Sequence, residues 1–203
     1  MNTHDLTVSE AARKRVSIRR YTDQPVTREV LHEVLEIAGK APSAWNVEPW
    51  RVIVVQDADL RQKLMAAAYG QPQVGAAPAV LVVSSDMEDA LGRIEEWLHP
   101  GIQGERREKE IATIQGIFEK MGLEGRASWG RNQTNIFLGY LLLALASKGL
   151  GSSPMLGFDP AQVRELLGLA PHAEIPALVA VGWPAEDGFP QHRLPVETIA
   201  DFR

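Results

Sequence analysis

The residues best suited to bind an anion lie in a short polar stretch near the N-terminus, RVSIRRY. Arg15, Ser17 and Arg19 alternate along it, so an extended backbone would project all three side chains to one side. Two guanidinium groups and a hydroxyl on one side suit a phosphate, which accepts charge-assisted hydrogen bonds. A charged stretch is more often a solvated surface, and that alternative stays open. A further arginine, Arg193, stands in the C-terminal sequence QHRLP.

A second unusual stretch, APSAWNVEPW at residues 41–50, joins a predicted helix to a predicted strand. Ser43 and Asn46 can offer polar contacts to a ligand, while the prolines restrict the backbone of the loop. Large aromatic rings require a surface to pack against. We expect Trp50 to fill the core beneath a sheet, and Trp45 to lie either in the core or at an interface that excludes water.

Composition excludes several kinds of chemistry. The chain has no cysteine, which removes disulfides, thiolate metal sites and a cysteine nucleophile. Its five histidines show no HxxxH or HExxH spacing, so we expect no metal site. They are His4, His32, His99, His172 and His192. With 21 basic and 26 acidic residues, the net charge of −5 gives no electrostatic reason to bind nucleic acid or an anionic membrane surface.

Elements must position these residues, and hydrophobic periodicity predicts strands that alternate with helices. Capping residues begin the predicted helices. These cover Thr7 to about Arg15, Thr27 to Gly39, Asp57 to Ala68 and Asp159 to about Leu167. The predicted strands cover residues 51–56, 79–83 and 175–182. In a chain of 203 residues this order predicts one domain over residues 1–203, with a sheet covered by helices.

Two segments depart from this alternation. Residues 87–125 form long helical stretches rich in Glu, Arg and Lys, and predict a helical excursion from the core. Residues 136–150 are apolar on nearly every face, so we expect a helix buried all round, in the core or a subunit interface. This segment is shorter than the ~20 residues that a membrane span requires. Gly149 should end the helix, because a dinucleotide fingerprint needs a strand before it.

Five motifs, taken together and in order, resemble those of the FMN-dependent nitroreductase family. They are RxSIRxY, APSxxNxxPW, GLGSxPMLGF after the apolar helix, VGxP at the end of a strand, and RLP near the C-terminus. The resemblance covers nearly the whole chain and leaves residues 87–125 without a clear match. It implies an α+β fold with a central mixed β-sheet surrounded by helices. It also implies a homodimer whose FMN lies at the subunit interface.

The resemblance assigns one group of residues to the phosphate end of FMN. Arg15, Ser17 and Arg193 would hold the phosphate. Arg19 would lie near the pyrimidine edge of the flavin, where its charge would stabilise the reduced form. No side chain would act as a nucleophile or an acid–base catalyst, so the role of Arg19 would be electrostatic.

Two further groups would contact the cofactor by the same resemblance. A loop from the partner subunit would close over FMN, and residues 154–157 would run beside the ring with the N–H groups of Leu156 and Gly157 near N5. Gln133 would reach the ribityl chain or ring edge, and Gln71 the ring edge. The complete predicted set is Arg15, Val16, Ser17, Arg19, Pro42, Ser43, Ala44, Asn46, Gln71, Gln133, Pro154, Met155, Leu156, Gly157 and Arg193.

The chain departs from the family pattern at two positions. Glu48 precedes the Pro-Trp pair where the family usually has Gln, a change that we expect to affect loop packing. Gln191 stands two residues before the RLP arginine where many members have Lys, which removes one positive charge from the phosphate end.

The implied activity is an oxidoreductase reaction. A hydride would pass from NAD(P)H to FMN N5 and then to a small oxidised substrate, such as a nitroaromatic or a quinone, in a ping-pong cycle. Trp97, Phe118 or Trp129 would stack above the ring, or else pack among themselves. The alternatives are a same-fold flavin destructase, enone reductase or dehalogenase, a non-enzymatic FMN-binding or sensory module, and a helical interaction protein. Because the N-terminal sequence lacks the apolar core of a secretory signal, we expect a cytoplasmic protein.

Overall fold

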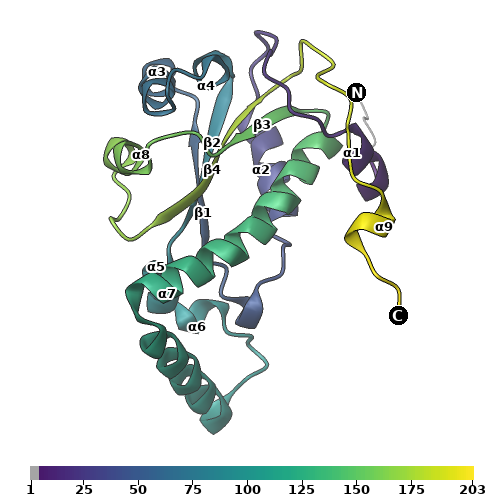
Figure 1. The fold of residues 1–203 in the computed structure, drawn as a ribbon. Coiled ribbons are helices and arrows are strands. Elements are labelled where there is room, and N and C mark those ends of the chain that lie inside the picture. The colour runs from purple at the N-terminus through teal and green to yellow at the C-terminus, as the bar shows by residue number, and fades with distance from the viewer. Residues whose placement is uncertain (1–4) are drawn as a thin grey trace.

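The computed structural model describes residues 5–203, so that His4 lies outside the described part. A four-stranded sheet forms its centre, with the strand order β1-β2-β4-β3 and helices on both faces (Figure 1). The strands are β1 (Trp50–Val55), β2 (Ala79–Ser85), β3 (Gly151–Met155) and β4 (Glu174–Gly182). This architecture confirms the α+β class and the three predicted strands, and adds β3, which was not predicted as a strand.

The sheet is antiparallel, which corrects the expectation of a mixed sheet. β1 pairs with β2, β2 with β4 and β3 with β4, each in antiparallel orientation. Helices α3 and α4 connect β1 to β2 at one end of the sheet (Figure 1). The chain therefore leaves β1 and enters β2 at the same end, as an antiparallel pair requires. Within residues 5–203, parallel pairing is confined to the single bridge between Ser17 and Ser152.

The predicted helices form at the expected places. They are α1 (Val8–Lys14), α2 (Arg28–Ala38), α3 (Ala58–Ala67) and α8 (Pro160–Leu167). Each follows a predicted capping residue whose side chain accepts an N–H from the first turn. These capping residues are Thr7, Thr27, Asp57 and Asp159. Three short helices were not predicted: η1 (Ala44–Asn46), α4 (Pro72–Ala76) and α9 (Val196–Ile199).

Two hydrophobic clusters fill the two faces of the sheet. Helices α2 and α7 (Gly104–Ser147) cover one face, where Leu81 of β2 is buried. Helices α3, α4 and α8 cover the other face, where Val80 of the same strand is buried. β2 is therefore buried on both faces, which explains its uninterrupted apolar sequence. Trp50 is buried and stacks on Phe137 with ring centroids 5.2 Å apart, as predicted.

The helical excursion predicted for residues 87–125 is confirmed. It consists of α5 (Met87–Gly92), α6 (Ile94–Trp97) and the first part of α7. Gly122 breaks α7 with a φ of 66° and a ψ of 174°, a conformation open mainly to glycine. Residues 104–121 therefore leave the axis of the longer helix and extend away from the sheet as an arm (Figure 1). A third hydrophobic cluster joins the arm to α5 and α6.

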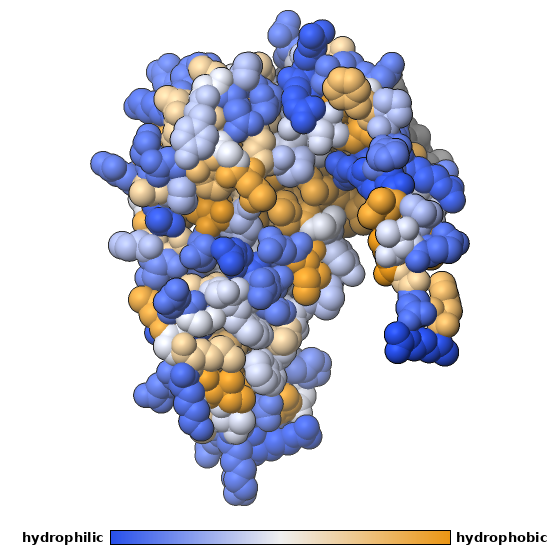
Figure 2. Space-filling view, in the orientation of Figure 1, coloured by the Kyte–Doolittle hydropathy of each residue, from blue (hydrophilic) through white to orange (hydrophobic). Residues whose placement is uncertain are grey.

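Within one chain, the part of α7 after Gly122 is buried on one side only, so residues 136–150 are not buried all round in the core, and their burial in a subunit interface stays a prediction. Phe137 and Leu141 are buried against the sheet, whereas the side chains of Ile136 and Tyr140 are 41% and 40% exposed. A sheet covers only one side of a helix. The other side borders a groove of about 920 Å³ between α1, α2 and α7. Figure 2 shows apolar residues in the hollow between the body and the C-terminal tail.

The end of α7 follows the prediction for Gly149. This residue has a φ of 78°, and its N–H donates to the Ala146 carbonyl at 3.1 Å. The N–H of Leu150 donates to the Leu145 carbonyl at 3.0 Å, which completes a Schellman motif. In the part of the chain that the structure describes, no helix is both long and apolar enough to cross a membrane.

Candidate functional site

The segment that carries Arg15, Ser17 and Arg19 runs beside the edge strand β3. Ser17 forms the parallel bridge with Ser152, and the Ile18 N–H donates to the Ser152 carbonyl at 3.0 Å. Ile18 is buried, so its neighbours on either side project away from the core, as the alternating pattern predicts. The Ile18 side chain lies close to the backbone of residue 151: a Cβ added there would lie 2.9 Å from it. Gly151 therefore permits this packing.

Two arginines lie close together beside this segment. Arg15 is half-buried, and burial followed by the nearby charge of Arg193 lowers its pKa. Within residues 5–203, no carboxylate forms an ion pair with either guanidinium group. Two neighbouring cations that lack an ion-pair partner suit an anion with at least two acceptor oxygens. Arg15 and Val16 also line a cavity of about 210 Å³ next to Ser152. Glu186 and Asp187 line the same cavity.

Gln191 brings the C-terminal tail to this place. Its amide Nε2 donates to the Ala12 carbonyl at 2.8 Å and to the Arg15 carbonyl at 2.6 Å. Both acceptors belong to the end of α1, where carbonyl groups lack helical partners. The residue that replaces the family's Lys thus fixes the tail against α1, two positions before Arg193.

Glu186 is a site residue that sequence reasoning missed. Its Oε1 accepts the backbone N–H groups of Arg19 at 2.7 Å and of Arg20 at 3.2 Å. The Tyr21 hydroxyl donates to the Ile18 carbonyl at 2.6 Å, and burial raises its pKa. These contacts fix the backbone around Arg19 while its side chain stays exposed. The only sign of this role in the sequence is the acidic residue type of Glu186, shortly after the VGxP motif.

The turn after β3 lies beside Gln71. Gln71 Nε2 donates to the Gly157 carbonyl at 2.6 Å, and Gln73 Nε2 donates to Gln71 Oε1 at 3.0 Å. Leu156 is 80% exposed in this turn. In the described residues, the Gly157 N–H has no hydrogen-bond acceptor. Met155 is buried in the core, so only its backbone is available to a ligand.

The second group of predicted residues consists of the loop at residues 42–46 together with Gln133. The Ala44 N–H donates to Gln133 Oε1 at 3.0 Å, and Asn46 Nδ2 donates to the Trp97 carbonyl at 3.1 Å. Ser43 Oγ accepts the Glu48 N–H at 3.1 Å. The loop and Gln133 therefore lie together.

The two groups lie far apart in one chain. Trp50, directly after the loop, pairs with Ser85, which pairs with Glu174 at the start of β4. Gly151, next to the bridge of Ser17, pairs with Gly182 at the other end of β4. Eight residue steps separate these levels, or roughly 26 Å at about 3.3 Å per step. Figure 1 shows the start of β1 and the start of β3 toward opposite ends of the sheet.

The aromatic residues of the excursion pack among themselves, which is one of the two predicted alternatives. Phe118 is fully buried and meets Trp129 edge to face at 4.8 Å. Trp45 completes the cluster, 5.7 Å from Phe118 and 6.1 Å from Trp129. Trp97 Nε1 donates to the Ala90 carbonyl at 2.7 Å. Of the two alternatives, Phe118 therefore follows the one in which the aromatic residues pack among themselves.

Arg15, with Arg193 near it, lies beside the edge strand β3 of an antiparallel sheet that has helices on both faces. The sequence profile of the nitroreductase family matches residues 12–183. The chain belongs to this family.

Among residues 5–203, no group of three His, Asp or Glu side chains is placed to hold a metal ion.

Comparison with known proteins gives both sequence and structural relatives. An NADH dehydrogenase of Thermus thermophilus is 54% identical over 198 residues, which cover 98% of this chain and 97% of the relative. An FMN reductase [NAD(P)H] of Bacillus subtilis is 32% identical over 185 residues, which cover 90% of this chain and 68% of the relative. A protein of Exiguobacterium sibiricum assigned as a nitroreductase, solved in complex with FMN, superposes with a TM-score of 0.85. It is 26% identical, and the match covers 100% of both chains.

Proposed function

We propose that the chain is an FMN-dependent oxidoreductase that takes a hydride from NAD(P)H and passes it to a small oxidised substrate. The observation that carries the proposal is the position of Arg15 on the segment that bridges to β3, with Arg193 brought near it by the hydrogen bond from Gln191 to the Arg15 carbonyl, and with no ion pair to either guanidinium in the described residues. Membership of the nitroreductase family supports it. A similar protein in complex with FMN and a similar FMN reductase support the choice of cofactor.

The phosphate and the two arginines would neutralise each other, and Ser17 would donate a further hydrogen bond. The backbone of Arg19 is fixed by Glu186, which leaves its exposed guanidinium free to face the pyrimidine edge. When bound, FMN supplies the hydride-accepting and hydride-donating chemistry. The Gly157 carbonyl accepts a hydrogen bond from Gln71, and the N–H of the same residue would donate to a ring nitrogen of FMN.

A homodimer would complete the site. One mononucleotide is too short to span the roughly 26 Å between the phosphate end and the loop at residues 42–46 of the same chain. A second copy would bring its own loop to the phosphate end of the first. The exposed Ile136 and Tyr140, together with Phe189 and Phe202 on the tail, supply apolar surface for that contact. The loop residues and Gln133 would then contact the partner's cofactor.

Flavin content tests the proposal directly. The purified protein should be yellow, or become so on addition of FMN, and chromatography after heat release should give FMN and not FAD. Anaerobic addition of NADH or NADPH should then bleach the visible flavin band. A protein that takes up no flavin would contradict the assignment. A bound flavin that neither nucleotide bleaches would indicate a non-enzymatic FMN-binding module instead.

A further inference from the structure

The loop at residues 43–48, here called the strained loop, has an unusual backbone. Trp45, Asn46 and Glu48 have φ values of 56°, 64° and 47°. In the described residues only one other residue that is not glycine, Tyr69, has a positive φ. Such conformations are unfavourable for residues with a side chain and persist only where the surroundings hold them. The strained loop therefore depends on contacts from outside itself.

The helical excursion provides several of those contacts. The Trp97 carbonyl at the end of α6 accepts a hydrogen bond from Asn46 Nδ2 at 3.1 Å. The ring of Trp45 packs beside both Phe118 and Trp129, which belong to α7 before and after the break at Gly122. The excursion thus contacts the loop from α6 and from the first part of α7, and Trp129 adds a contact from the second part of α7.

Arg51 fixes the other end of the strained loop. Its Nη1 donates to the Glu48 carbonyl at 3.2 Å, while the Glu48 N–H donates to Ser43 Oγ. Both the backbone N–H and the backbone carbonyl of Glu48 are therefore hydrogen-bonded to side chains. Because these contacts use the backbone, the replacement of the family's Gln by Glu48 leaves them unchanged.

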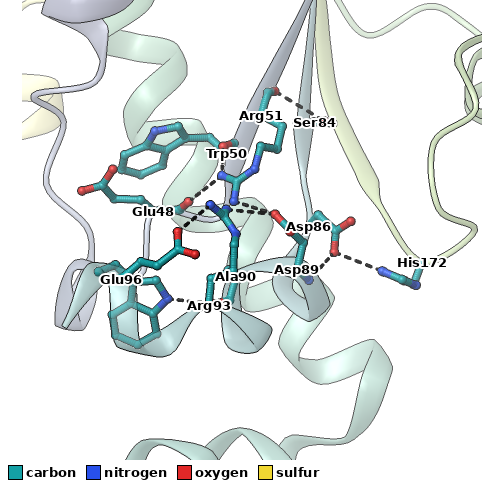
Figure 3. A network of polar contacts seen from close by, with 11 residues as sticks. Glu48, Trp50, Arg51, Ser84, Asp86, Asp89, Ala90, Arg93, Glu96 and His172 are labelled. Atoms are coloured by element: carbon teal, nitrogen blue, oxygen red, sulfur yellow. Dashed lines mark hydrogen bonds and ion pairs between the residues drawn. The ribbon is translucent and has the colours of Figure 1, made fainter. Parts of the chain in front are cut away.

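The same guanidinium reaches the excursion (Figure 3). Arg51 Nη2 donates to Asp89 Oδ2 of α5 at 2.6 Å, and Arg93 Nη2 donates to the same oxygen at 3.0 Å. Arg93 Nη1 in turn donates to Glu96 at 3.2 Å, and its guanidinium forms no hydrogen bond or ion pair with the strained loop among the described residues. Arg51 therefore joins α5 to the loop, whereas Arg93 joins α5 only to α6.

We propose that Arg51, with Asp89, is a positioning residue that holds the strained loop in the conformation required to close over the cofactor of the partner subunit. The proposal rests on the proposed function. It gives the helical excursion a role: its helices α5 and α6 act as the support against which the loop is held. Arg51 itself does not touch the cofactor.

The matched pair of variants Arg51→Met and Arg93→Met tests this role. Each removes one guanidinium from Asp89, but only the first removes the bond to the Glu48 carbonyl. Titration of the apoprotein with FMN should give a Kd about tenfold higher for Arg51→Met and a Kd within about twofold of wild type for Arg93→Met. Arg51→Lys should recover part of the affinity, because it restores the positive charge beside Asp89.

Amide hydrogen exchange of the apoprotein provides a readout that a general loss of stability would not move. The peptide covering residues 41–50 should exchange about tenfold faster in Arg51→Met, while peptides from β4 exchange as in wild type. If Arg51→Met does not fold, Asp89→Asn replaces it, with the same expected direction. Equal Kd values for the two methionine variants, or faster exchange throughout the chain, would overturn the proposal. Failure of the wild-type protein to bind FMN would instead overturn the proposed function.

Discussion

Replacement of Arg15 by Met should separate ligand binding from stability. The methionine keeps an unbranched apolar stem in the half-buried position but removes the guanidinium group. The pKa of Arg15 is lowered by burial and by Arg193, so the charged form is less favourable in the folded protein than in the unfolded chain. The free energy of unfolding of the apoprotein should therefore stay the same or increase in Arg15→Met. This effect should be independent of pH near neutrality, because arginine stays protonated there.

FMN binding should change in the opposite direction. Loss of a hydrogen bond between charged groups costs about 1.5–3 kcal/mol, which corresponds to roughly a 10- to 150-fold higher Kd. Riboflavin, which lacks the phosphate, provides the matched ligand control. Its Kd should be nearly the same for wild type and Arg15→Met, so the variant should lose most of the preference for FMN.

Calorimetric titration of the apoprotein with both flavins, together with thermal unfolding of the apoprotein, measures all three quantities. An equal loss of affinity for FMN and riboflavin would show that Arg15 does not face the phosphate. A clearly lower melting temperature for the apoprotein would show that the charge of Arg15 is stabilised by the fold, contrary to the reasoning from its pKa.

Three further predictions concern the flavin, the dimer and pH. Arg19→Ala should lower the two-electron midpoint potential of bound FMN by on the order of 30 mV, the equivalent of about 1.4 kcal/mol, in a spectroelectrochemical titration; a larger shift in Arg15→Ala would reverse the two assignments. Tyr140→Glu should place a charge on the exposed face of α7 and weaken a dimer at least about tenfold in sedimentation; an unchanged assembly would exclude this face as the interface. The pKa of Tyr21 is raised by burial, so the folded state keeps its proton above pH ~10, where the unfolded state loses it. The advantage of wild type over Tyr21→Phe in the free energy of unfolding should therefore be complete below pH ~10 and decrease above it in denaturant titrations; a difference that is constant with pH would contradict the burial of the hydroxyl.

Local features of the fold could be predicted because neighbouring residues determine them. Thr7, Thr27, Asp57 and Asp159 each satisfy N–H groups within three residues, so the sequence shows where the helices begin. The alternation of Arg15, Ser17 and Arg19 is likewise a property of an extended backbone. The continuous apolar run of β2 indicates burial on two faces before any partner is known.

The candidate site was predicted only as two separate sets of residues. The motifs indicate a phosphate end and a loop, but not that β4 separates them by roughly 26 Å in one chain. The sequence likewise gives no reason to expect that Gln133 accepts the Ala44 N–H, because 89 positions separate these residues. Glu186 and Arg19 are 167 positions apart, so their contact exists only after β4 returns beside the N-terminal segment.

The sequence by itself determined the starts of four capped helices, three of the four strands and the helical excursion. The tertiary structure decided the strand directions, the exposed side of α7 and the partners of each polar group. β3, with the sequence GSSPM, lacks the apolar pattern of a strand and forms because β4 and Ser17 pair with its backbone. The left-handed backbone at Trp45, Asn46 and Glu48 is unfavourable for each residue alone. It is held by contacts with Trp97, Phe118 and Arg51, and such contacts exist only once distant segments have packed together.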